Sequence, residues 1–112
     1  MTTQAITIYK GLTFGPLVIN AVDTEGGEYS LSGWSVHAEI RRNSDGAVLL
    51  DLNPLITDAP NGEITIDLAD SATDTLETGN AEWDLILEAP GGQLLPPIVG
   101  GPVAVIRSIT QP

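Results

Sequence analysis

Polar and apolar residues alternate with a period of two along most of the chain. The segment "WSVHAEIR" is the clearest case. One face of a strand there would carry Trp34, Val36, Ala38 and Ile40, and the opposite face would carry Ser35, His37, Glu39 and Arg41. The same alternation recurs in "EITIDL", residues 63–68, and in "NAEWDLILE", residues 80–88. This pattern predicts half-buried β-strands.

Turn signals separate the alternating segments. Asp45-Gly46 and Asn61-Gly62 are typical of tight turns, because glycine readily adopts a positive φ. Further strands are expected at residues 5–9, 17–22 and 47–52 and in the closing segment 93–110. Only residues 68–78 lack strand character, and Asp70 or Ser71 could cap a helical turn there that ends at Gly79, with Leu76 pointing inward.

The expected fold is therefore all-β, an antiparallel β-sandwich of about seven strands with one short helical turn near residues 70–78. The whole chain, residues 1–112, has the length of a single domain. It contains no cysteine, so packing has to stabilise the fold without a disulfide. "MTTQAITIYKG" does not read as a secretory leader, and the longest apolar stretch is broken by prolines and glycines, so no membrane span is expected.

The charge balance narrows the choice of partners. The chain has 15 Asp and Glu against four Lys and Arg, a formal net charge of −11. Such a surface repels nucleic acids and anionic membranes, so we expect neither as a partner. Acidity of this kind keeps a protein soluble and unassociated, and it could also serve to attract a basic partner surface or cations.

The residues offer no recognisable catalytic or cofactor site. His37 is isolated and lies on the polar face of its strand, and the carboxylates Glu82, Asp84 and Glu88 read as a solvated face rather than an acid–base pair. Calcium-loop and phosphate-loop motifs are absent from the sequence. Trp34 and Trp83 are in phase with aliphatic neighbours, which predicts core positions. We therefore expect no enzyme, cofactor or metal site.

One apolar segment, "LLPPIVGGP" at residues 94–102, does not fit a regular strand. Proline donates no ladder hydrogen bond, so this segment should form an edge, a bulge or a crossing between sheets. Its apolar side chains are either tucked under the end of the sandwich or offered to a partner. If they are offered, the expected interface consists of Leu94, Leu95, Pro96, Pro97, Ile98 and Val99, with the N-terminal "AITIY" beside it.

An ordered set of motifs resembles a known family. These motifs are "G-x-x-x-L-S-G-W-x-V-x-A-x-I-R" (Gly27–Arg41), a D-G hairpin, "G-x-I-T-I-x-L" (Gly62–Leu68), "T-x-x-L-x-x-G" (Thr73–Gly79), "A-x-W-D-L" (Ala81–Leu85) and a final "V-I-R-S-I-T". Together they look like the immunoglobulin-like N-terminal domain of tailed-phage baseplate upper proteins and tail-fibre proteins. The resemblance covers residues 5–110 and departs from the family at the proline-rich "LPPIVGGP".

The resemblance implies an immunoglobulin-like sandwich and a virion structural role without enzymatic activity. Family modules precede a fibre shaft, whereas this chain stops at Pro112, so we expect an adaptor or attachment component of the baseplate or tail-fibre complex, assembled in the host cytoplasm. Its expected partners are other phage tail, baseplate or fibre proteins and further copies of itself, a trimer first. The alternatives are a carbohydrate-binding module that contacts host glycans and a capsid or tail decoration protein.

Overall fold

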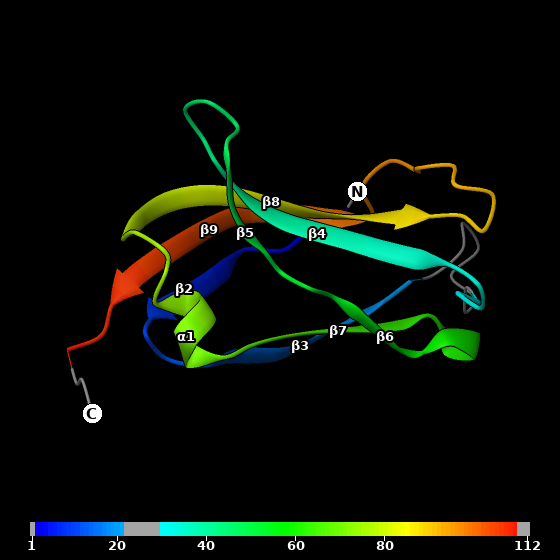
Figure 1. The fold of residues 1–112 in the computed structure, drawn as a ribbon, viewed down its shortest axis with the longest axis horizontal. Coiled ribbons are helices and arrows are strands. Elements are labelled where there is room, and N and C mark those ends of the chain that lie inside the picture. The colour runs from blue at the N-terminus through cyan, green and yellow to red at the C-terminus, as the bar shows by residue number, and fades with distance from the viewer. Residues whose placement is uncertain (1, 22–29, 110–112) are drawn as a thin grey trace.

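Two layers of β-strands face each other, with a short helical turn at one end (Figure 1). The computed structural model describes residues 2–21 and 30–109. The larger sheet contains β1 (Thr2–Thr3), β2 (Ile6–Lys10), β4 (Ser35–Arg42), β5 (Val48–Asp51), β8 (Gly79–Glu88) and β9 (Val99–Arg107). The smaller sheet contains β3 (Phe14–Asn20), β6 (Leu55–Asp58) and β7 (Glu63–Leu68). Two short helical elements, η1 (Ala59–Asn61) and α1 (Asp70–Thr73), flank β7.

The strand order identifies the architecture. The larger sheet runs β1–β9–β8–β4–β5, with β2 also paired to β9, and the smaller sheet runs β3–β7–β6. In an immunoglobulin sandwich, strands B, E and D share one sheet and strands C, F and G share the other. Here β3, β7 and β6 correspond to strands B, E and D, and β4, β8 and β9 correspond to strands C, F and G. The protein is an immunoglobulin-like β-sandwich, which confirms the fold class predicted from the sequence.

The N-terminal strand departs from the expected antiparallel arrangement. β1 and β2 pair in parallel with β9, whereas every other strand pairing in the described part of the chain is antiparallel. A period of two determines which face a side chain occupies but not the direction of the neighbouring strand. The sequence also did not indicate β6, a four-residue strand after Pro54. Val22, the expected end of the second strand, lies outside the described residues.

The inward positions of the predicted alternation form the core. Ile40, Ile64, Ile66 and Leu85 are fully buried, and Ile40 lies opposite Trp83 across β4 and β8. The exposed fraction of Trp83 is 4%, which confirms its predicted core position. Trp34 is half-buried and packs against this core from its rim.

The helical turn at residues 70–73 forms where it was predicted but is capped differently. Ala69 takes the N-cap position, so the predicted cap by Asp70 or Ser71 is wrong. Asp70 is the first helical residue, and its carboxylate accepts a hydrogen bond from the Ser71 N–H at 2.7 Å. Leu76 is buried as expected, while Gly79 begins β8 instead of ending the helix.

Side-chain hydrogen bonds fasten this turn to the rest of the sandwich. The buried Thr73 hydroxyl donates to the carbonyl of Leu12 at 2.7 Å. The Lys10 ammonium donates to the carbonyls of Asp74 and Leu76, which joins β2 to the end of the turn. No helix in residues 2–21 and 30–109 has the length and apolarity needed to cross a membrane.

The hairpin tip between β4 and β5 projects from the sandwich (Figure 1). Gly46 adopts φ +71° there, as the predicted Asp45-Gly46 turn requires. The Ala47 N–H donates to the Asp45 carboxylate at 3.0 Å, and Arg42 reaches the other carboxylate oxygen at 3.2 Å. The Ala47 hydrogen bond, aided by the Arg42 charge, holds the pKa of Asp45 below its ordinary value.

Candidate functional site

The apolar segment at residues 94–98 is the bulged return of the hairpin after β8. Leu94 forms an isolated bridge with Glu88, and the N–H groups of Leu95 and Ile98 donate to carbonyls of β8 at 3.0 Å each. The two prolines between them have no N–H to donate, so the segment departs from a regular ladder. A bulge was one of the three arrangements expected from the sequence.

Pro102, at the end of the same stretch, does not lie on a sheet edge, which was another of the expected arrangements. It falls inside β9, which has neighbours on both sides. Pairing between β9 and the N-terminal strand is interrupted between Thr3 and Ile6, opposite Gly101 and Pro102. The missing N–H of Pro102 therefore falls where the ladder is already broken, which explains a proline in a central strand.

The six residues of the predicted interface occupy different environments. Leu94 and Pro96 are exposed, whereas Leu95, Pro97 and Ile98 are half-buried. Val99 begins β9 and is only 5% exposed, so it contributes to the core as well as to the local surface. Val99 is therefore tucked under the sandwich, which is one of the two expected arrangements, while Leu94 and Pro96 are open to solvent.

A groove runs beside this segment, between the edges of the two sheets. We call it the edge groove; its lining consists of Thr2, Gln4, residues 17–21, Leu87, Leu95 and residues 97–99. Its volume is about 520 Å³, within the range of pockets that hold ligands. None of its lining residues is charged, although the chain carries 19 charged side chains of Asp, Glu, Lys and Arg.

The N-terminal strand forms one wall of the edge groove. The Thr2 N–H donates to the Ile98 carbonyl at 3.0 Å, and the Gln4 N–H donates to the Gly100 carbonyl at 2.8 Å. First and last strands are therefore neighbours, as expected. The residues beside the apolar segment are Thr2–Gln4, while the expected "AITIY" pairs further along β9.

β3 forms the other wall, and sequence reasoning missed it. Within residues 2–21 and 30–109, β3 pairs with β7 alone, so it is an edge of the smaller sheet there. Leu17, Val18 and Ile19 contribute apolar side chains to the groove, and Val18 is 49% exposed. Pro16 was an available signal, because proline within a strand indicates an edge.

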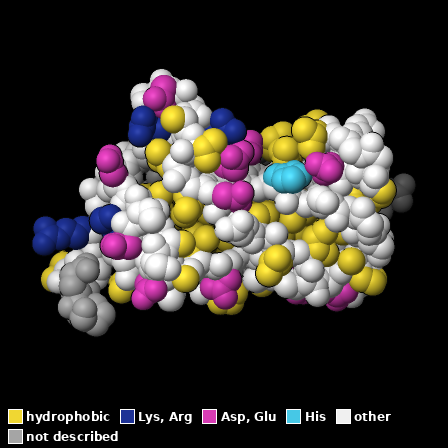
Figure 2. All heavy atoms as spheres, in the orientation of Figure 1, with side chains coloured by type: hydrophobic (Ala, Val, Ile, Leu, Met, Phe, Trp, Pro, Cys, Tyr) yellow, Lys and Arg dark blue, Asp and Glu magenta, His cyan; other side chains and the backbone are white. Residues whose placement is uncertain are grey.

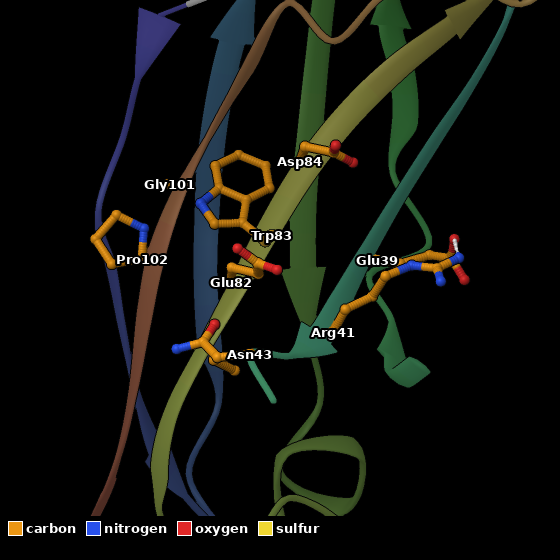
Figure 3. Close-up of a pocket in the computed structure, with 9 residues that line it drawn as sticks. Glu39, Arg41, Asn43, Glu82, Trp83, Asp84, Gly101 and Pro102 are labelled. Carbon is orange, nitrogen blue, oxygen red and sulfur yellow. Dashed lines mark hydrogen bonds and ion pairs between the residues drawn. The ribbon is translucent and has the colours of Figure 1, made fainter. Parts of the chain in front are cut away.

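A second hollow, on the outer face of β4 and β8, gathers charged side chains (Figure 3). Arg41 lies 3.0 Å from the Glu39 carboxylate and also donates to the Gly46 carbonyl at 3.0 Å. Its guanidinium thus turns along its own strand and leaves Glu82 and Asp84 exposed. Arg41 therefore lies beside Glu39 on the outer face, as the strand alternation predicted.

The remaining candidate groups also lie on this outer face. His37 is exposed, and its Nε2 lies 3.0 Å from a carboxylate oxygen of Glu88. The two residues lie on the paired strands β4 and β8, and the contact is a histidine–carboxylate pair at the solvent-facing side of the sheet. In residues 2–21 and 30–109, no three His, Cys, Asp or Glu side chains come together as metal ligands.

Comparisons with known proteins give only distant structural likenesses. No protein-family model matches the sequence. No curated protein matches it either. Among solved structures, the fibronectin(III)-like modules of Clostridium thermocellum CbhA are similar at 15% sequence identity with a TM-score of 0.47, covering 96% of this chain and 93% of that chain. The fold assigned above follows from strand order and pairing, and no function is transferred from this likeness.

Proposed function

We propose that this protein is a tailed-phage virion component, an adaptor or attachment subunit of the baseplate or tail-fibre complex that acts through protein–protein contacts. The edge groove is the observation that carries the protein–protein part. It is an uncharged hollow with a mostly apolar lining, bordered by sheet edges on an otherwise acidic protein. Apolar surface beside an open strand edge is a common place for another protein to bind.

The phage setting rests on the ordered motifs along the chain. "G-x-I-T-I-x-L" lies on β7 and the turn before it, and "A-x-W-D-L" lies on β8. These motifs supply much of the core of an immunoglobulin-like sandwich, the fold of the family that they resemble. On this proposal the protein acts in the tail of the virion.

The aromatic residues favour an adaptor over a glycan-binding module. Sugar recognition by stacking needs exposed aromatic faces, but Trp83 is buried and Trp34 is half-buried. Among the described aromatic residues, Tyr9 is the one with a largely exposed side chain, at 49%. A single exposed ring is a poor platform for an extended glycan.

Co-expression with the products of neighbouring genes tests the proposal. We expect one of them, a baseplate or fibre protein, to co-elute with this protein in size-exclusion chromatography with light scattering. The same measurement tests the predicted homo-oligomer. The proposal fails if no neighbouring product binds and mass spectrometry finds no peptide of this chain in purified particles of the phage that encodes it.

A further inference from the structure

We infer that the edge groove receives an extended strand from a basic partner protein, and that this strand pairs with the free edge of β3. The inference deepens the proposed function and rests on it, since it specifies how the adaptor would hold its partner.

The first support is the free backbone edge of β3. Residues 17–20 run in continuous antiparallel register with β7, from Leu17 opposite Ile66 to Asn20 opposite Glu63. In such a pair, alternate residues point their N–H and C=O groups away from the neighbouring strand. No described strand pairs with this side of β3, which leaves those groups to an added strand.

The second support is a comparison of the edge strands. β1 has only two residues, and β2, β5 and β6 each end in a charged residue, namely Lys10, Asp51 and Asp58. Charges on edge strands oppose pairing with other chains. β3 contains no charge, and its protection is limited to Pro16 and the irregular register before Leu17. Residues 17–20 are therefore an unprotected edge, and they line the groove.

The third support is the space between the layers. A strand added to β3 would point alternate side chains toward the larger sheet. In that direction lie Leu95, Pro97 and Ile98, which line the same groove. The occupant should therefore have apolar residues at every second position and uncharged residues between them.

The charge of the whole chain favours a basic partner. Its formal net charge is −11, and Figure 2 shows carboxylates spread over the face in view. Lys10, Arg41 and Arg42 are already engaged by groups of this chain, and most described carboxylates form no ion pair with Lys or Arg. A second copy with a net charge of −11 is repelled, whereas cations flanking an apolar strand are attracted.

The test uses a fluorescent peptide that alternates Thr and Val between Lys-Lys ends, with binding followed by anisotropy at low and physiological salt. Two control peptides replace the lysines with glutamates or N-methylate alternate residues. Val18→Asp places a charge in the groove, and Val48→Asp is its matched control because Val48 is also 49% exposed but lies on β5, away from the groove. Should Val18→Asp unfold, Asn20→Glu replaces it at an exposed position of the same wall.

We expect the groove variant to weaken peptide binding by about tenfold or more and Val48→Asp to leave it unchanged. Both control peptides should bind much more weakly. The inference is overturned if the lysine peptide does not bind, if both variants behave alike, or if either control peptide binds as well. It is also overturned if Val18→Asp abolishes self-association, because a second copy would then occupy the groove.

Outcomes for the two proposals are separable. If a neighbouring gene product binds the wild type and Val18→Asp equally well, the adaptor function stands and this inference fails. If no neighbouring product binds but the peptide results are as expected, the groove chemistry stands and the phage role fails.

Discussion

Replacing Trp83 with alanine should remove much of the stability of this sandwich. The indole is 4% exposed, and its Nε1 donates to the Gln4 carbonyl at 2.8 Å. Burying a tryptophan removes ~150–250 Å² from water, which at ~25 cal/mol per Å² amounts to ~4–6 kcal/mol. Part of that area is already buried in the unfolded chain, so we expect a loss of ~3–5 kcal/mol in the free energy of unfolding. A domain of this size has a total stability of only ~5–15 kcal/mol.

Urea unfolding followed by circular dichroism measures this loss without relying on the tryptophan that is removed. Trp34→Ala is the matched control, and it should cost less because Trp34 is half-buried at the rim. Trp83→Phe keeps a ring but removes the donor to Gln4, so it should lose ~1 kcal/mol for the hydrogen bond in addition to the lost ring contacts. The reasoning is refuted if Trp83→Ala costs under about 1 kcal/mol, or less than Trp34→Ala.

Three further substitutions test the packing and the electrostatics. Gly100→Ala would place a Cβ 2.6 Å from a backbone carbonyl oxygen of β8 and should cost ~1–3 kcal/mol in urea unfolding, whereas Gly91→Ala, with nothing within 4 Å, should be neutral. Thr73→Val leaves the Leu12 carbonyl without its donor and should lower the unfolding free energy by ~1–3 kcal/mol, detectable as a lower melting temperature. Because the pKa of Asp45 is lower in the folded protein than its ordinary value of 3.8, the ionised carboxylate stabilises the fold at pH values above 3.8. This contribution is lost as the pH falls through the folded-state pKa. Asp45→Asn should therefore show a smaller drop in urea midpoint than the wild type between neutral pH and about pH 3.

The sequence predicted the fold class well because a period of two assigns each side chain to a face. Trp83, Leu85 and Leu87 are buried on one face of β8, as their phase indicated. Strand direction and edge position are not local properties. The parallel pairing of β2 with β9 depends on where the chain re-enters the sheet, which no alternation records.

The sequence predicted one wall of the edge groove but not the other, again because edge position is not a local property. The prolines of residues 94–102 marked an irregular apolar segment, and residues 95 and 97–99 do line the edge groove. The opposite wall, residues 17–21, reads as an ordinary strand, and Pro16 just before it is the local sign of an edge. The assembled sheet order is what shows that this strand has a single neighbour in the described part of the chain.

The glycines and the proline in the middle of β9 are explained by close packing against the N-terminal strand. The backbone packs so closely there that a Cβ on Gly101 would lie 2.7 Å from the Gln4 carbonyl oxygen, the same atom that accepts the Trp83 hydrogen bond. This contact occurs where the N-terminal strand breaks between β1 and β2, opposite Pro102. The break lets the indole reach a backbone carbonyl and removes the need for a donor at the proline. The sequence "GGP" therefore meets the packing requirement of a buried tryptophan.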